Sequence, residues 1–412
     1  MIFSTTFGKN VRNNVKMDTV KNKIIIWGID DVNTLGLVRE VGEAGLDFLF
    51  LLKGKKAAAA RSKYIKKIHQ INSNEEALRY LISTFKNASK KPIIITSGDG
   101  TTVFIDQNKG LLEQYFIIPG TGVKGDAEFY TDKNNMINLA SEIGILCPES
   151  KYVKWDSSID NIAYPCFIKP SHQNAGHFNE FKFKICNTRN ELQETLTKVR
   201  HDSEFIVQDY IKSEYEIVVF GARMMDGKTE IAGAIVRDRL AVGISGHGLV
   251  TDKIPACVDV AKISEFLDRI DYKGLFGFEY GVMNDKAYFY EVNLRNDGTA
   301  HCFYNAGSRL TLAYIYSCAG IDYSTLPIKV TQEGWFIDEL YDFGNVLEGK
   351  ISKKQWKKDM KQATIMRYYD KSDKAPYQYL KKRKWLNITK YIILGRYRQT
   401  VVSILDKVGM KK

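Results

Sequence analysis

Two carboxylates and an amide are expected to converge on one sheet face within residues 274–298, GLFGFEYGVMNDKAYFYEVNLRNDG. Two aromatic-rich strands in this segment flank an Asn-Asp turn, which is typical of β-hairpins. On the second strand, Glu291 and Asn293 are two residues apart, so both side chains leave the same face. If the turn holds three residues, 284–286, then Glu279 lies directly opposite Glu291. The spacing therefore predicts a cluster of hard oxygen donors.

A divalent cation would explain such a cluster. Like charges that face each other across a sheet are destabilising unless a cation lies between them. Carboxylate and amide oxygens suit Mg²⁺ bridging nucleotide phosphates, with Mn²⁺ as the alternative metal. On spacing alone, an exposed hairpin whose glutamates only face water is an equally good explanation. The neighbouring segments therefore decide between the two.

Two upstream lysines are candidates for phosphate contacts. Lys169 ends an apolar strand in YPCFIKP, so its ammonium emerges at the end of that strand. Lys133 opens a helix, where a cation lies next to the positive end of the helix dipole, and a bound phosphate would remove this conflict. Ordinary solvent exposure is the alternative for each lysine. The small, polar segment 171–180 is expected to be a mobile loop and is a weak phosphate-binding signal.

The segment FIVQDYIKSEYEIVVF is a candidate for contacts with a nucleoside. A strand ends here and the chain crosses to the next strand through Gln208, Asp209, Tyr210 and Ile211. Backbone groups of this crossing are available to an adenine, and Glu214 is placed to accept hydrogen bonds from ribose hydroxyls. A strand, a turn and a second strand without a ligand explain the segment equally well in isolation.

Alternating strands and helices make up the N-terminal part. Strands are expected at 23–27, 47–52 and 93–96, with a helix at 33–44 that Gly45 terminates. Units of this length indicate a parallel α/β sheet. The first turn lacks G-x-G-x-x-G, so a nicotinamide or flavin site is poorly supported.

An α+β region is expected to follow. Its predicted elements are a helix at 132–143 ending at Gly144, strands around 166–169, 181–185 and 205–208, and an antiparallel pair at 216–224 and 230–236. We place the main domain boundary near residue 130.

Taken in order, these segments resemble the ATP-grasp superfamily over roughly residues 23–320. Its most specific part is G-x-x-x-x-E followed by E-V-N-x-R, both within 274–298. The segments resemble in particular the carbamoyl-phosphate-synthetase-like and D-aspartate-ligase-like carboxylate–amine ligases. The N-terminal part is similar to the preATP-grasp domain of these enzymes at residues 35–39, 60–64 and 96–99.

The resemblance implies a role for each candidate residue. Lys133 and Lys169 would contact α- and β-phosphate oxygens of ATP, the crossing 208–211 would hold the adenine, and Glu214 would hold the ribose. The implied ligands of one or two Mg²⁺ ions are Glu279, Glu291 and Asn293.

Two arginines carry the implied catalytic roles. Arg295 would steady the transferring phosphoryl group or the acyl phosphate. Arg237 and Arg239 lie where related enzymes place a basic residue against phosphate or a substrate carboxylate, and the sequence does not say which points inward.

The implied reaction joins a carboxylate to an amine through an acyl phosphate. The carboxylate attacks the γ-phosphorus, and the amine then attacks the acyl phosphate, without a side-chain nucleophile. Small-molecule or glycan carboxylates and amines are the expected substrates, and the segment GISGHG at 243–248 is a candidate substrate loop. The alternatives are a kinase-like or carboxylase-like activity, and a non-catalytic nucleotide-binding or scaffold protein with this fold.

The positive charge of the chain is confined to its C-terminal end. The net charge is +12, but residues 351–412 hold 18 Lys+Arg against 4 Asp+Glu, which leaves 42 against 44 elsewhere. From 381 onward, cations alternate with apolar residues at roughly helical spacing. Such a helix either contacts an anionic membrane surface or packs on the body with a solvated basic face. Nucleic-acid binding is disfavoured because the body is slightly acidic.

We expect a cytoplasmic protein with reduced thiols. Its six cysteines lack metal-binding spacing, and its N-terminus lacks an apolar signal core. If the tail binds lipid, the protein is expected to be peripheral at the inner membrane face. The expected organisation is α/β with four parts. They are a disordered extension at 1–21, a parallel α/β preATP-grasp domain at 22–130, an α+β ATP-grasp domain at 131–330, and a basic helical C-terminal extension at 331–412.

Overall fold

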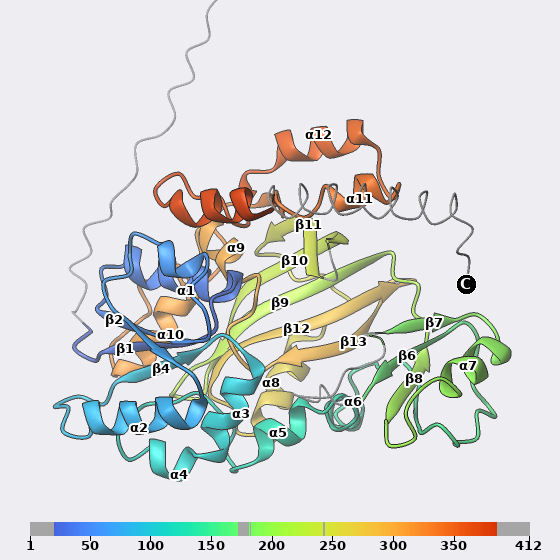
Figure 1. Ribbon diagram of the computed structural model, residues 1–412, viewed down its shortest axis with the longest axis horizontal. Helices are drawn as coiled ribbons and strands as arrows, with labels where there is room; N and C mark the ends of the chain where they lie inside the picture. Colours follow the sequence, from blue (N-terminus) through green and yellow to red (C-terminus); the bar gives the residue numbers. More distant parts are fainter. Residues whose placement is uncertain (1–19, 172–180, 182, 242–243, 385–412) are drawn as a thin grey trace, which may run out of the picture.

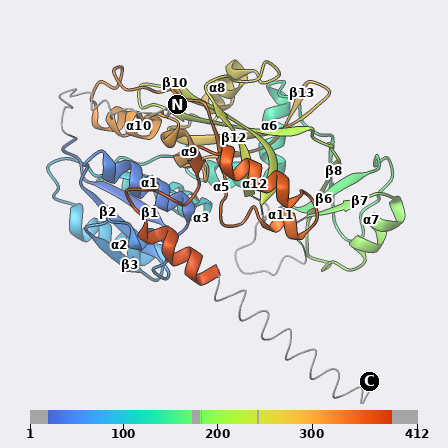
Figure 2. The ribbon, with the colours of Figure 1, turned by 90° about the horizontal axis from the view of Figure 1, so that it is seen from above.

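The computed structural model describes residues 20–171, 181, 183–241 and 244–384. Three β-sheets carry the fold (Figure 1). In both views the N-terminal sheet and a small four-stranded sheet lie at opposite ends of the molecule, with the long central sheet between them (Figures 1 and 2). The predicted loop at 172–180 and the basic tail from 385 onward lie outside the described residues.

The N-terminal sheet is parallel, as predicted. Its strands are β1 (Ile24–Gly28), β2 (Phe48–Lys53), β3 (Ile68–Ile71) and β4 (Ile93–Thr96), in the spatial order β3-β2-β1-β4. The elements between and after them are α1 (Val32–Glu43), η1 (Ala59–Arg61), α2 (Asn74–Phe85), α3 (Asp99–Gln107) and α4 (Lys109–Leu112). All of β1 is buried, because helices cover both faces of the sheet.

Local capping fixes the ends of α1. Asp31 precedes the helix, and its carboxylate accepts a hydrogen bond from the N–H of Thr34 at 2.8 Å. Gly45 follows it with a φ of 72°, the left-handed conformation that a terminal glycine adopts at low cost. The predicted helix stop at Gly45 is therefore confirmed, and the start of α1 lies directly at the carboxyl end of β1.

The central sheet has seven strands in the order β13-β12-β9-β10-β11-β14-β15. They are β9 (Tyr215–Arg223), β10 (Thr229–Ala241), β11 (Ile244–Thr251), β12 (Gly274–Met283), β13 (Lys286–Asn293), β14 (Gly334–Ile337) and β15 (Ile365–Met366). The helices that follow or flank this sheet are α5 (Asp126–Thr131), α6 (Lys133–Glu142), α8 (Val260–Arg269), α9 (Ala300–Asn305) and α10 (Leu310–Ala319). The described part of the predicted substrate loop, 244–248, is wrong as a loop because it forms the start of β11.

The small sheet has the order β5-β8-β6-β7 and carries one helix. Its elements are β5 (Ser150–Val153), β6 (Cys166–Pro170), β7 (Lys184–Cys186), α7 (Arg189–Leu196) and β8 (Phe205–Asp209). All its neighbouring strands run antiparallel. The carboxyl end of β6 carries Lys169 toward the central sheet.

The C-terminal extension is not purely helical. The extension 331–412 is predicted to be helical, but it contains β14 and β15 besides α11 (Gly344–Leu347) and α12 (Lys353–Gln362). Phe336 and Ile365 are buried in the same core cluster as residues of α1 and β9, so these strands complete the central sheet. Helix resumes at 375–384. Within the described ranges, no helix is long and apolar enough to cross a membrane.

Candidate active site

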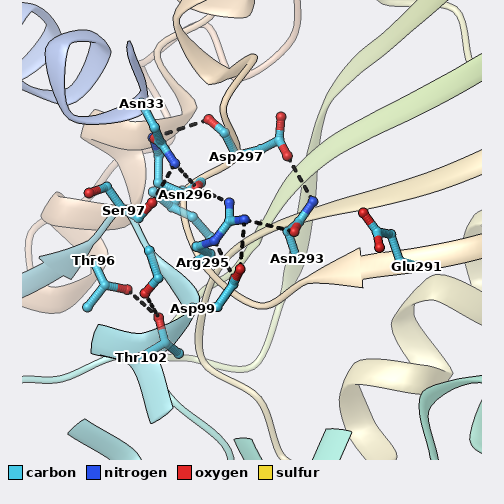
Figure 3. A network of polar contacts seen from close by, with 12 residues as sticks. Asn33, Thr96, Ser97, Asp99, Thr102, Glu291, Asn293, Arg295, Asn296 and Asp297 are labelled. Carbon is cyan, nitrogen blue, oxygen red and sulfur yellow. Dashed lines mark hydrogen bonds and ion pairs between the residues drawn. The ribbon is translucent and has the colours of Figure 1, made fainter. Parts of the chain in front are cut away.

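The candidate site lies where the N-terminal sheet meets the end of the β12–β13 hairpin. Asn33 and Asp99 open α1 and α3, which follow β1 and β4. The strand order reverses between these two strands, and the crevice at such a switch point is the usual ligand position in α/β sheets. Figure 3 shows Asn33 beside Asn296, and Asp99 beside Arg295, in the segment that follows β13 of the central sheet.

The hairpin pairs in the predicted register, with Glu279 opposite Glu291. The predicted loop at 284–286 is wrong, because only Asn284 and Asp285 separate the strands. Both have positive φ, which two-residue hairpin turns require. A β-bulge next to Glu279 adds one residue to β13 and restores the register that a three-residue loop would have given.

Glu291 is paired with the first candidate lysine. Lys133 Nζ donates to Glu291 Oε2 at 2.8 Å. Burial disfavours the charge on Lys133, but Glu291 outweighs burial and raises its pKa. Lys133 in turn lowers the pKa of Glu291. The unfavourable position of Lys133 at the start of α6 is offset further by Asp132, whose carboxylate caps the helix.

Lys169 has no carboxylate within ion-pair distance in the described part of the chain, and its ammonium lies 5.9 Å from the centre of the Phe167 ring. Burial, together with the charge of Lys133, lowers the pKa of Lys169 to about 7, and Glu291 opposes this shift only in part. Lys169 is therefore a lysine whose charged form has no negatively charged partner among the described residues.

Arg237 on β10 reaches the second carboxylate of the hairpin. Its guanidinium donates to Glu279 Oε2 at 2.6 Å, to Glu216 Oε2, and to Ser245 Oγ at 3.0 Å. The arginine is 8% exposed. Burial opposes its charge, but Glu279 and Glu216 raise its pKa above the usual value. Burial also raises the pKa of Glu279, against the influence of Arg237.

Arg239 points elsewhere. The pairing of β10 with β11 shifts between Arg237 and Arg239, so the two side chains do not share an environment. Arg239 binds Asp342 at 2.9 and 2.8 Å and Asp359 at 2.8 Å, both in the C-terminal extension. Of the two candidate arginines, only Arg237 contacts the hairpin carboxylates.

Arg295 joins the two sheets. Its Nε donates to Asp99 Oδ1 at 2.5 Å, and its Nη2 donates to Asn293 Oδ1 at 3.0 Å (Figure 3). Nη1 donates to the carbonyl of Asn296 at 3.0 Å. Burial opposes the charge of Arg295, but Asp99 raises its pKa. The implied catalytic arginine is thus held between the candidate metal ligand Asn293 and the N-terminal sheet.

Asn293 is also tied to a carboxylate that follows the strand. Its Nδ2 donates to Asp297 Oδ2 at 3.1 Å and to Glu279 Oε1 at 3.3 Å. Gly277 on β12 makes room for this arrangement, since a Cβ there would lie 2.9 Å from the Asp297 carboxylate. Asn296 in the same turn bonds reciprocally with Asn33 of α1. Both sheets therefore fix the end of β13.

The metal candidates form a small oxygen set. In the described ranges, no group of three or more His, Cys, Asp or Glu side chains is placed to hold a metal ion. Glu279, Glu291 and Asn293 supply two carboxylates and one amide oxygen. This set fits Mg²⁺, which usually takes few protein ligands and completes its shell with phosphate oxygens and water.

Part of the predicted nucleoside-binding segment, 208–211, uses its polar groups for hydrogen bonds within the protein. The amide of Gln208 donates to Ser150 Oγ at 2.8 Å, and the backbone N–H groups of Asp209 and Tyr210 donate to carbonyls of neighbouring segments. Among the described residues, the N–H of Ile211 has no acceptor. Glu214 is exposed, and its carboxylate accepts the N–H of Asn284 at 3.0 Å.

Three contributors were not predicted as site residues: Asp99, Glu216 and Asp297. Glu216 on β9 lies directly opposite Arg237, which follows the predicted strand 230–236 by one residue, so an acid facing a base at the end of the predicted antiparallel pair was an available signal. Asp99 meets the site only through a tertiary contact, whereas Asp297 lies four residues after Asn293.

Charge compensation unites these contacts. Lys133 is paired with Glu291, Arg237 with Glu279, and Arg295 with Asp99. Among the residues that the structure describes, each basic candidate except Lys169 thus has an acid at hydrogen-bond distance. An anion that approaches the bases must compete with these acids, and a cation that approaches the acids must compete with the bases.

Comparison with known proteins places part of the chain in a known domain family. A family model for the ATP-grasp domain matches residues 138–308. D-aspartate ligase of Enterococcus faecium is 24% identical over 321 residues, which cover 68% of this chain and 73% of that enzyme.

Two solved structures share the fold. N5-carboxyaminoimidazole synthetase of Staphylococcus aureus, complexed with ADP, has a TM-score of 0.62 at 16% identity and covers 81% of this chain and 86% of that one. L-amino acid ligase of Bacillus licheniformis has a TM-score of 0.60 at 13% identity, with coverage of 76% and 79%. At these identities the structural matches establish the fold alone.

Proposed function

Because this chain carries an ATP-grasp domain and belongs to the ATP-grasp superfamily, we propose that it is an ATP- and Mg²⁺-dependent ligase joining a carboxylate to an amine through an acyl phosphate. The reaction would release ADP and phosphate. The observation that carries the proposal is the convergence of Lys133, Lys169, Arg237 and Arg295 on the face that holds Glu279, Glu291 and Asn293.

In the proposed complex, the basic residues exchange partners. Lys133 leaves Glu291 for a nucleotide phosphate, and Lys169 gains a negatively charged partner, which it lacks among the described residues. Glu279, Glu291 and Asn293 would hold Mg²⁺, or Mn²⁺, which would neutralise charge on the phosphate oxygens. Because acids and bases are already adjacent, the exchange needs only short side-chain movements.

The two arginines serve the transferred group in this proposal. Arg295, held by Asp99, faces the position where the γ-phosphoryl group meets the substrate carboxylate and stabilises the charge that develops there. Arg237 stabilises charge on the phosphate or on the substrate carboxylate while Glu216 keeps it oriented. No side-chain nucleophile is required, because the substrate carboxylate itself attacks phosphorus.

For the nucleoside, we propose contacts at the 208–211 crossing and at Glu214. The N–H of Ile211 is the available donor to adenine, since those of Asp209 and Tyr210 are used within the fold. Glu214 keeps acceptor capacity toward ribose hydroxyls besides its one bond to the hairpin turn.

The proposal also covers the substrates of the protein and its location in the cell. We propose small-molecule or glycan substrates in cell-surface polysaccharide or peptide modification, and a cytoplasmic protein that contacts the inner membrane face through its basic tail. These points rest on the charge of 351–412 and on the likeness to D-aspartate ligase. The division into 22–130, 131–330 and 331–412 also remains a proposal.

Calorimetric titration with a non-hydrolysable ATP analogue tests the site. Wild type should bind the analogue with Mg²⁺, and Glu291→Ala should weaken binding about tenfold or more, equivalent to about 1.4 kcal/mol. ADP release in the presence of candidate carboxylates and amines would then identify substrates. A folded wild-type protein that binds no nucleotide would support the alternative, a scaffold protein with this fold.

A further inference from the structure

Arg367, directly after β15, reaches the candidate site from the C-terminal extension. It lies outside the residues that match the ATP-grasp family model. We infer that Arg367 is a positioning residue, which aligns Arg237 and Asn293 for nucleotide and metal by holding the backbone behind each of them. The inference rests on the proposed function.

The Arg367 side chain is 5% exposed and spans two segments of the site. Its Nη1 donates to the carbonyl of Ser245 on β11, and its Nη2 donates to the carbonyl of Gly298, which follows β13, at 3.4 Å. These two carbonyls belong to segments more than fifty residues apart in the sequence. One planar guanidinium therefore fixes the separation between them.

Each of the two segments is one contact away from a candidate functional side chain. Ser245 Oγ accepts a hydrogen bond from Arg237 Nη1 at 3.0 Å. Gly298 follows Asp297, whose carboxylate accepts from Asn293 Nδ2 at 3.1 Å. A shift of Arg367 would therefore reach both the basic and the oxygen-donor sides of the site.

The extension holds Arg367 firmly. Glu339 accepts hydrogen bonds from the backbone N–H groups of Arg367, Tyr368 and Tyr369. Asp338, which is fully buried, lies 3.9 Å from Arg367 Nε, and its own N–H donates to the Gly246 carbonyl at 2.7 Å. Backbone bonds and a buried acid thus restrict the guanidinium to one position.

A purely structural role explains Arg367 poorly. Burying a guanidinium is costly, and apolar residues of similar volume often replace buried ion pairs without loss of stability. Arg239 is the useful comparison, because it ties β10 to the same extension through a two-pronged ion pair with Asp342. Arg367 instead directs two N–H groups at backbone carbonyls beside the site, an arrangement suited to setting positions.

The test compares Arg367→Met and Arg367→Lys with the matched control Arg239→Met. Binding of a non-hydrolysable ATP analogue is titrated against Mg²⁺ in the full chain, and urea unfolding gives the stability of each variant. Arg367→Met should raise the Mg²⁺ concentration for half-maximal binding about tenfold, as loss of outer-shell support does at metal sites. Arg367→Lys should recover part of this loss, and Arg239→Met should stay within about twofold of wild type even where it unfolds more easily.

Two results overturn the inference. One is that folded Arg367→Met needs the same Mg²⁺ concentration for half-maximal binding as wild type. If the methionine variant does not fold, the same result in Arg367→Lys overturns the inference. The other is an equal rise of this Mg²⁺ concentration in Arg239→Met, which would show that loosening the C-terminal extension is by itself enough to weaken metal-dependent binding. Failure of the wild type to bind nucleotide would instead refute the proposed function, so the two failures are distinguishable.

Discussion

Affinity for a nucleotide should fall as the pH rises through 7, and Lys169 should be the cause. Burial and the neighbouring Lys133 lower the pKa of Lys169 to about 7 in the ligand-free protein. Only the protonated amine attracts phosphate. A bound phosphate favours that form, so Lys169 takes up a proton on binding whenever the pH is above its free pKa.

The magnitude follows from this pKa. If bound phosphate raises the pKa of Lys169 above about 9, affinity is constant well below pH 7 and declines tenfold per pH unit above it. Between about pH 6 and about pH 8 the dissociation constant should therefore rise roughly tenfold, or about 1.4 kcal/mol.

Calorimetry without divalent metal isolates this effect. Lys169→Met is the matched variant: it should bind more weakly at low pH but lose the slope that Lys169 causes. Titration of the nucleotide itself, and of Glu279, whose pKa burial raises, persists in both proteins and cancels in the comparison. Lys133→Met should keep a slope but shift it to higher pH, because the charge of Lys133 is one of the two causes that lower the pKa of Lys169. Equal slopes in wild type and Lys169→Met would refute the reasoning.

Three further outcomes are expected. Glu291→Gln should weaken Mg²⁺-dependent nucleotide binding at least tenfold, while binding without metal, measured by the same calorimetry, should change much less. Asp373→Ala should lower the free energy of unfolding in urea by about 3–5 kcal/mol, because Arg39, 1% exposed and 3.1 Å from Asp373, would be left as a buried unpaired charge; a wild-type value would contradict this. Gly277→Ala should raise the Mg²⁺ requirement by displacing Asp297, and a crystal structure of the variant with Asp297 unmoved would count against the mechanism.

Short-range patterns accounted for much of the fold and of the hairpin site. Alternating apolar runs and terminal glycines such as Gly45 located the parallel sheet, because both depend on neighbouring residues. The two-residue spacing of Glu291 and Asn293 likewise fixed their common face. The prediction that Glu279 faces Glu291 was correct, but it assumed a three-residue turn. The turn has two residues, and a bulge that no sequence pattern indicated restores the register.

Contacts between distant segments could not be predicted. Asp99 and Arg295 are 196 residues apart, and only the docking of the two sheets brings them together. The opposite environments of Arg237 and Arg239 depend on a bulge in the pairing with β11. Strand β15 has two residues, too few for a period-two pattern, so its extension was predicted as helix alone.

The pairing of site acids with site bases also has a consequence for selectivity in the cell. A free phosphate ion that displaced Glu291 from Lys133 would leave that half-buried carboxylate without a counter-charge, and a lone metal ion would do the same to the lysine. A ligand that carries both a negative and a positive charge supplies a new partner to the lysine and to the carboxylate at once. The protein should therefore bind the nucleotide–metal complex more tightly than it binds orthophosphate or a metal salt alone.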